Sequence, residues 1–124
     1  MKIIKLADFD SIYYVDVFFQ EYMELFGKSR NTYESCLKKL RTNLRILDTE
    51  KKKVITYRQF EKLQESDVYS IRHVCQDNDR VIFAFIDEDD DVILLSSCKE
   101  KNTSDYHKAI SRAEERLRIL MEEN

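Results

Sequence analysis

Three consecutive runs of β-favouring residues decide the fold of this chain: VYSIRHVC at 68–75, RVIFAFI at 80–86 and VILLSSC at 92–98. Each run is rich in Val, Ile, Phe or Tyr, side chains that pack well on a pleated sheet. Short polar segments separate the runs, at 76–79 and in the acidic run 87–91. Because consecutive strands joined by short turns pair in antiparallel fashion, the sequence predicts an antiparallel meander over 68–98.

The segments on either side of this meander carry apolar residues at helical spacing. Upstream, the pattern predicts a first helix over about 11–26, ended by Gly27 in a left-handed C-cap, and a second helix that begins near Asn31. Downstream it predicts a last helix that opens at Thr103 or Ser104. The three apolar stripes are Ile12, Val15, Phe19, Tyr22 and Phe26; Tyr33, Leu37, Leu40, Leu44 and Leu47; and Tyr106, Ile110, Ala113, Leu117 and Leu120.

Two shorter segments complete the predicted order of elements. Lys2 to Leu6 is a plausible first strand, and 54–63 reads as a short extended piece followed by a helical turn. The result is an α+β fold in a single domain, 1–124, with the order β-α-α-β-β-β-α. An N-terminal strand and a helical hairpin, with the C-terminal helix, are expected to pack on one face of an antiparallel sheet.

Length and composition narrow the class of protein. The chain has 124 residues, 43% of them hydrophobic and 11% aromatic, which fits one domain with its own core. A single Gly and no Pro exclude glycine-loop phosphate sites. No apolar run approaches the roughly 18 residues of a membrane span, and the N-terminus lacks the pattern of a signal peptide. We therefore expect a cytoplasmic protein without a membrane partner.

Three widely spaced cysteines, Cys36, Cys75 and Cys98, form no C-x-x-C pair. An odd number at such spacing favours reduced thiols over a disulfide framework or a zinc site. Cys36 lies beside an apolar stripe and is expected in the core. Only two histidines are available as further ligands, so no metal or other cofactor is expected.

The net charge of −3 conceals two charged poles. Residues 28–62 carry eleven basic and four acidic groups, a balance of +7, whereas residues 63–124 carry eight basic and fifteen acidic groups, a balance of −7. Such a molecule can present a locally positive face to an anion although it is acidic overall.

Basic and titratable residues cluster around the ends of the predicted strands. Arg72 and Arg80 flank the first hairpin of the meander, Lys99 and Lys101 follow its last strand, and Tyr106 and His107 lie in the first turn of the last helix. Two arginines, two lysines, a tyrosine and a histidine at one end of a sheet would suit a phosphodiester. The plainer alternatives are that both arginines pair with the 87–91 run or are solvated, and that Tyr106 packs in the core.

The remaining candidates are His73 and the basic face of the second helix. His73 shares its strand parity with Tyr69 and Ile71, which favours a buried, hydrogen-bonded histidine. The face with Lys38, Arg41 and Arg45 is either solvated or binds RNA backbone or an acidic partner.

The later half of the chain resembles the RelE/HigB toxin superfamily in the order and spacing of its motifs. The matching segments are Phe60-Glu61-Lys62-Leu63, Val68-Tyr69-Ser70-Ile71-Arg72, Asp79-Arg80-Val81-Ile82-Phe83, Val92-Ile93-Leu94-Leu95, Lys99-Glu100-Lys101 and a helix with Ala109 and Ala113.

This resemblance implies the toxin of a type II toxin-antitoxin pair, a metal-independent endoribonuclease that cleaves mRNA on the ribosome and is neutralised by a cognate antitoxin. It implies that His107 or Tyr106 transfers protons and that Arg72, Arg80 and Lys99 stabilise charge. Lys101, Lys38, Arg41 and Arg45 are then candidates for RNA binding.

The chain also departs from the family pattern. Val68 and Ser70 stand where a pair of lysines is usual, and Glu100 stands where a second basic residue is usual. The alternative is therefore a non-catalytic member that binds protein, directed at gyrase like ParE-type relatives, or a phage-related adaptor.

Overall fold

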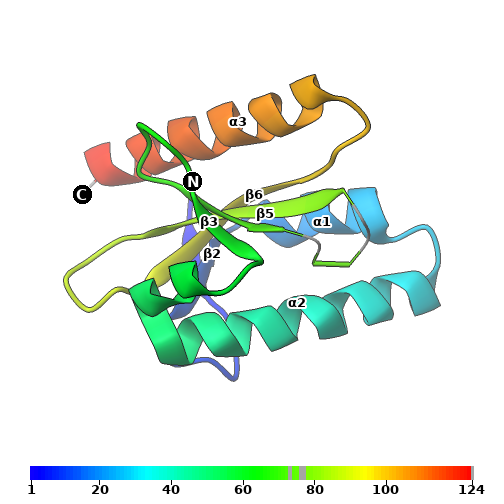
Figure 1. The fold of residues 1–124 in the computed structure, drawn as a ribbon, viewed down its shortest axis with the longest axis horizontal. Coiled ribbons are helices and arrows are strands. Elements are labelled where there is room, and N and C mark those ends of the chain that lie inside the picture. Colours follow the sequence, from blue (N-terminus) through cyan, green and yellow to red (C-terminus); the bar gives the residue numbers. More distant parts are fainter. Residues whose placement is uncertain (73, 76–77, 124) are drawn as a thin grey trace.

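The structure, a computed structural model, describes residues 1–72, 74–75 and 78–123, which form one mixed sheet and three α-helices (Figure 1). The six strands are β1 (Ile3–Lys5), β2 (Ile12–Val15), β3 (Phe60–Lys62), β4 (Tyr69–Arg72), β5 (Asp79–Phe85) and β6 (Val92–Lys99). The helices are α1 (Phe18–Phe26), α2 (Arg30–Glu50), the 3₁₀ helix η1 (Lys51–Thr56) and α3 (Thr103–Glu122).

The predicted meander is confirmed and forms one side of the sheet. The strand order is β1-β2-β6-β5-β4-β3, and β3, β4, β5 and β6 pair successively in antiparallel fashion. Arg72 lies directly opposite Arg80, and Arg80 lies opposite Cys98, so that the three side chains follow one row across the sheet. The α+β class and the predicted last helix are confirmed as well.

The predicted helix over 11–26 is wrong in its first part, which is strand β2. β2 runs parallel to β6, with Ile12 opposite Val92 and Tyr14 opposite Leu94, so the sheet is mixed rather than antiparallel. Ile12 and Val15 are both buried at the ends of this four-residue strand. The spacing of three between Ile12 and Val15 fits a helix, but the β-branched and aromatic residues of 12–15 favour the strand that forms here.

The predicted C-cap of α1 and the predicted N-cap of α2 are also wrong. Gly27 has φ of −95°, so it is no left-handed cap. A Cβ at Gly27 would lie 2.4 Å from the carbonyl oxygen of Met23, so close approach, and not handedness, requires glycine. Helix α2 is capped by Ser29, whose Oγ accepts a hydrogen bond from the Thr32 amide at 3.1 Å, rather than by Asn31.

Two further boundaries differ from the sequence pattern. In the segment 54–63 the helical turn, η1, precedes the extended piece, β3, the reverse of the predicted order. Helix α3 begins one residue after Asn102, which forms a capping box with Asp105, so Thr103 and Ser104 are helical residues and not caps.

Helices cover both faces of the sheet, not one as predicted. Figure 1 shows α3 above the strands and α2 below them. β6, in the centre, is buried at its first seven positions because both faces are covered. On the α3 side the contact is close, since Ala109 and Ala113 are small and Ser96 Oγ donates a hydrogen bond to the Ala109 carbonyl at 2.8 Å. None of the described helices is long and apolar enough to cross a lipid bilayer.

Candidate functional site

Arg80 of β5 and Tyr106 of α3 meet at one end of the sheet. The guanidinium carbon of Arg80 lies 5.0 Å from the centre of the Tyr106 ring. Arg80 also forms an ion pair with Glu100 at 3.5 Å, and the Tyr106 hydroxyl donates to Glu61 Oε1 at 3.4 Å. We call these four residues, Arg80, Tyr106, Glu61 and Glu100, the Arg80–Tyr106 site.

Secondary structure fixes both central residues of this site. Arg80 is the second residue of β5, between β4 and β6, and its side chain is only 13% exposed. Its Nη1 donates to the carbonyl of Asp79 at 3.1 Å. Tyr106 lies in the first turn of α3, whose start is fixed by the capping box of Asn102 and Asp105. The guanidinium and the phenol therefore need little reordering to act together.

The environment of Tyr106 keeps its hydroxyl protonated at neutral pH. Burial raises the pKa of Tyr106, and the nearby Glu61 carboxylate raises it further, while the positive charge of Arg80 lowers it to a smaller extent. A phenol with a raised pKa is a hydrogen-bond donor and a proton donor near pH 7, not a base.

His107 follows Tyr106 and is exposed. Successive helical residues are about 100° apart around the axis, so the imidazole points away from the sheet while its Cα stays beside the Arg80–Tyr106 site. His107 makes no hydrogen bond or ion pair with any described residue. β5 and α3 thus bring Arg80 and Tyr106 into contact, whereas a role for His107 beside them stays a prediction.

Arg72 turns away from its neighbour across the sheet. Its Nη2 donates to the carbonyl of Arg58 at 3.3 Å, and its side chain lines a hollow of about 400 Å³ with Asn43, Arg58 and Gln59. The predicted pair of arginines is therefore adjacent in the sheet but does not form one binding group for a single phosphate.

Lys99 lines a different hollow, on the other flank of α3. This hollow of about 320 Å³ lies between β6, α1 and α3, and it contains Lys108 and Arg112 as further cations. We call it the Lys99 hollow. Sequence analysis missed Lys108 and Arg112, although their spacing of four residues places them on one flank of a helix.

The acidic residues of the Lys99 hollow are largely engaged elsewhere. Glu21 is paired with Arg116 at 2.6 Å, and Asp105 accepts the amide of Lys101 at 2.8 Å in the cap of α3. The backbone amides of Lys101 and Asn102 both donate to Asp105, and these hydrogen bonds, with that of Lys101 the stronger influence, lower the pKa of its carboxyl group. Glu24 and the charged Asp105 therefore face the three cations while Arg116 neutralises Glu21, which leaves the lining a net charge of about +1.

The other predicted RNA-binding residues lie apart from Tyr106. Lys101 is exposed in the connection before α3. Lys38, Arg41 and Arg45 line a hollow of about 360 Å³ on α2, where Arg41 pairs with Asp8 at 3.2 Å. Since α2 and α3 lie on opposite sides of the sheet (Figure 1), the α2 cations do not join the Arg80–Tyr106 site.

The acidic run 87–91 is not the partner of Arg72 or Arg80. Asp87 accepts the amides of Asp89 and Asp91, each at 3.0 Å, and thereby closes its own turn. Asp90 pairs with Lys52 at 3.3 Å. His73, predicted to be buried, lies outside the described residues.

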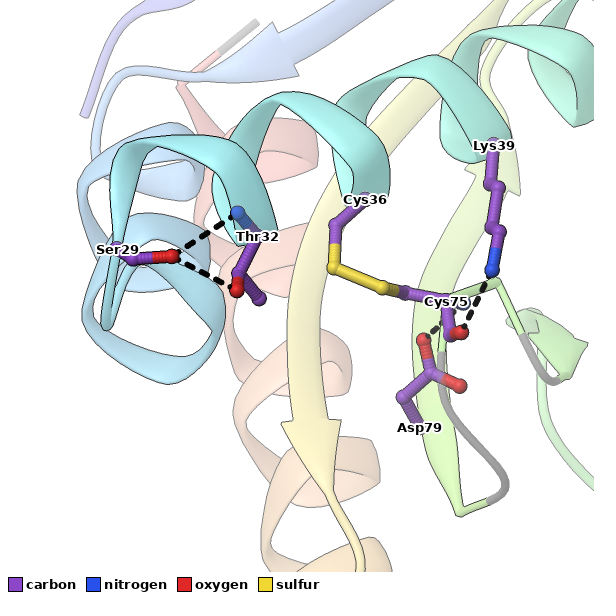
Figure 2. Close-up of a disulfide and its surroundings, with 6 residues drawn as sticks. All are labelled: Ser29, Thr32, Cys36, Lys39, Cys75 and Asp79. Carbon is purple, nitrogen blue, oxygen red and sulfur yellow. Dashed lines mark hydrogen bonds between the residues drawn. A yellow bond between two sulfur atoms is a disulfide. The ribbon is translucent and has the colours of Figure 1, made fainter.

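Cys36 and Cys75 form a disulfide, so the prediction of reduced thiols is wrong for this pair (Figure 2). Their Cα atoms are 4.8 Å apart although 39 positions separate them in sequence. Linear spacing cannot show that α2 lies against the segment after β4, and this is why the pair was missed. Cys98 remains a free thiol and is buried, and burial raises its pKa to about 11.

Among the described residues, no group of three or more His, Cys, Asp or Glu side chains is placed to bind a metal ion. The sequence matches no protein-family model and no curated protein.

Proposed function

We propose that this chain is the toxin of a type II toxin-antitoxin pair and acts as a RelE/HigB-like mRNA endoribonuclease on the ribosome. The observation that carries the proposal is the contact between Arg80 and Tyr106, two residues that the resemblance links to catalysis and that come from different elements. The proposal implies a cytoplasmic protein, where ribosomes are found, and a cognate antitoxin that covers this end of the sheet.

The proposed chemistry needs a base, an acid and positive charge around one phosphate. A base takes the proton of a ribose 2′-hydroxyl, that oxygen attacks the adjacent phosphorus, and the 5′-oxygen leaves with a proton from an acid. The products are a 2′,3′-cyclic phosphate and a 5′-hydroxyl, so the step consumes no water molecule.

The environments of the side chains suggest how the roles are divided. His107 is exposed, and its imidazole is assigned the removal of the 2′-hydroxyl proton. Tyr106, whose pKa is raised by burial, suits the donor to the leaving oxygen or to the phosphate. Arg80, whose guanidinium is always charged, is assigned the stabilisation of the negative charge that develops on the phosphorane.

The Lys99 hollow gives the proposed substrate a path beyond the scissile phosphate. Lys108 lies about 200° around α3 from Tyr106, on the other flank of the same helical turn. An RNA strand that crosses the start of α3 would meet Tyr106 and Arg80 on one side, and Lys99, Lys108 and Arg112 on the other. Lys99 then binds a flanking phosphate rather than the one that reacts.

A second candidate function is a RelE/ParE-fold module that binds protein without catalysis. The observation that favours it is the pair of carboxylates in the Arg80–Tyr106 site, since Glu100 already pairs with Arg80 and Glu61 accepts the Tyr106 hydroxyl. Both carboxylates would repel a phosphate unless they move away when RNA binds.

The decisive experiment is to induce the chain alone in growing bacteria and to map mRNA 5′ ends. We expect growth arrest with new ends within translated reading frames. His107→Ala and Arg80→Gln should lose at least tenfold in cleavage while circular dichroism shows intact folding. Ser111→Ala, an exposed change on the same helix, is the control and should cleave like the wild type.

Two outcomes separate the candidates. Growth arrest without new mRNA ends, unchanged in both site variants, would reject the nuclease and favour the protein-binding module. Faster cleavage by Glu100→Gln than by wild type would show that this carboxylate restrains an active nuclease.

A further inference from the structure

The Cys36–Cys75 disulfide joins two parts of the chain next to the Arg80–Tyr106 site. Cys36 comes from α2, and Cys75 lies in the segment between β4 and β5 (Figure 2). Lys39, one turn beyond Cys36, donates from Nζ to the carbonyl of Cys75 at 3.3 Å. The amide of Cys75 donates to Asp79 Oδ2 at 2.6 Å, so Cys75 is bound from both sides.

A continuous set of contacts leads from this disulfide to the candidate site. Asp79, buried at 1% exposure, accepts the Cys75 amide with its carboxylate. Through its carbonyl it accepts Nη1 of Arg80 at 3.1 Å, and Arg80 in turn lies over the Tyr106 ring. Two hydrogen bonds to the same residue, Asp79, thus connect the Cys75 amide with the Arg80 guanidinium.

The chain contains a free thiol as well as the disulfide, so its described cysteines are not all oxidised. Cys98 is buried and unoxidised, and among the described cysteines one pair alone is bridged. Permanent disulfide frameworks belong to oxidising compartments, whereas in a reducing compartment a disulfide is usually transient and linked to redox state. The two residues also differ in exposure, since Cys36 is fully buried and Cys75 is half-buried.

We propose that Cys36 and Cys75 form a reversible thiol–disulfide exchange site for low-molecular-weight thiols, and that its oxidation state sets the position of Arg80. The premise of a reducing compartment and the consequence for RNA cleavage both rest on the proposed function, whereas the exchange itself can be measured without RNA.

The exchange follows from ordinary thiol chemistry. A small thiolate attacks the accessible sulfur of Cys75, the bond between the two protein sulfurs breaks, and Cys36 leaves as a thiolate that takes a proton. A second small thiolate then attacks the mixed disulfide and releases Cys75. Two small thiols become one small disulfide and supply the two electrons that reduce the protein; oxidation by the small disulfide is the reverse.

The first test is a redox titration of the whole chain in buffers of graded reduced to oxidised glutathione. The samples are quenched with acid, and free thiols are counted by alkylation and mass spectrometry. We expect the Cys98→Ala variant to pass between zero and two labelled thiols along one curve, whether approached from the oxidised or the reduced side. A folded protein that stays fully oxidised, or fully reduced, over the whole series overturns the proposal.

The second test asks whether Arg80 responds. The Nε–Hε resonance of Arg80, assigned by its loss in Arg80→Lys, should shift between the two redox states with the same midpoint as the thiol count. Cys36→Ser/Cys75→Ser should show the reduced position in every buffer; if that variant does not fold, wild type in excess dithiothreitol replaces it. An Arg80 resonance that is identical in both states overturns the coupling.

The two proposals fail separately in these measurements. If Arg80 shifts with the thiol count but RNA is cut in neither state, the exchange site stands and the nuclease falls. If RNA is cut equally in both states while Arg80 does not move, the nuclease stands and the coupling falls.

Discussion

At the scale of single residues, the Arg116 side chain binds β6 just beyond the part of that strand that pairs with β2. Its Nη1 donates to the carbonyl of Leu95 at 2.7 Å, just past Leu94, the last residue of β6 paired with β2. The same guanidinium makes two hydrogen bonds to Glu21 of α1, at 2.8 and 2.6 Å. Arg116 thus joins α3, β6 and α1 in one buried contact.

We predict that Arg116→Met lowers the free energy of unfolding by about 2 to 3 kcal/mol, because a buried carbonyl and a carboxylate both lose a charged donor. Urea denaturation measures the change. Arg118→Met is the matched control on the same helix: its ion pairs to Glu115 and Glu122 are on the surface, so its loss should have little effect. Equal losses in the two variants would contradict this account.

A second residue-scale prediction concerns alkaline pH. Burial, with the nearby charge of Asp79, raises the pKa of Tyr22 above its ordinary value. The unfolded chain therefore loses this proton first, so stability is constant below about pH 10 and falls as pH rises above it. Tyr22→Phe should weaken that fall, as measured by the free energy of unfolding from pH 8 to 11.

The same variant should be no less stable than the wild type at pH 7. The Tyr22 hydroxyl is buried and has no hydrogen-bond partner in the described structure, so its removal leaves no group unsatisfied and can add up to about 1 kcal/mol. A marked loss of stability at pH 7 would mean that the hydroxyl does have a favourable partner.

At the scale of elements, Asp48 connects the end of α2 to the segment before β2. Its carboxylate accepts the amides of Asp10 and Ser11, at 3.1 and 2.9 Å, and the Ser11 hydroxyl at 2.6 Å. Partial burial raises the pKa of Asp48, but these hydrogen bonds and the charge of Lys51 outweigh it, and the pKa is lowered overall.

We predict that Asp48→Asn reduces stability at pH 7 and makes it less dependent on pH in acid. With a folded pKa below the unfolded one, the stability that Asp48 contributes is present above about pH 4 and is lost as pH falls through the folded value. Thermal unfolding between pH 2 and 7 measures this. Asp16→Asn, at an exposed carboxylate that accepts only the Lys2 amide at 3.4 Å, is the control and should change the profile less.

The disulfide is the other connection between elements. A chain-entropy estimate for a bridge across 39 positions is about 4 kcal/mol. We predict that dithiothreitol lowers the Tm of the wild type by roughly 10 °C or more. Cys36→Ser/Cys75→Ser should be insensitive to dithiothreitol, and Cys98→Ala should respond as the wild type does. No change in the wild type would mean that the bridge adds no stability.

The elements also show what sequence alone can predict. The meander was predictable because β5 and β6 are mainly apolar runs between clear turn signals, and α3 because its apolar stripe extends over about four turns. β2 was not, since Ile12 and Val15 fit a helical spacing and only pairing with β6 decides between strand and helix. For the candidate site, two of the predicted residues, Arg80 and Tyr106, are in contact, whereas Arg72 and Lys99 line separate hollows because neighbours in the fold decide side-chain direction.

At the scale of the whole molecule, the positive charges form two separate surfaces. One is the Lys99 hollow beside α3, and the other is the α2 face with Lys38, Arg41 and Arg45 on the opposite side of the sheet. In the proposed complex, an RNA strand at the Arg80–Tyr106 site would meet the first surface and not the second. The α2 face remains accessible to an acidic partner.

We predict that Lys108→Glu/Arg112→Glu weakens binding of a 2′-O-methyl RNA oligonucleotide at least tenfold and makes the salt dependence of log Kd shallower by about one unit. Lys38→Glu/Arg45→Glu, the matched charge reversal on α2, should change both much less. Fluorescence anisotropy between 50 and 300 mM salt provides the measurement. A larger effect of the α2 variant would place the RNA on the other side of the sheet.

The parallel pairing of β2 with β6 has a consequence for biogenesis. β1 and β2 join the rest of the sheet through β6 alone, and an isolated two-stranded ribbon is marginal in water. A growing polypeptide therefore cannot settle its first strands until the stretch 92–99 has left the exit tunnel, and folding becomes a late, largely all-or-none event. Translation products that end before β6 would lack a complete sheet and would be open to proteolysis.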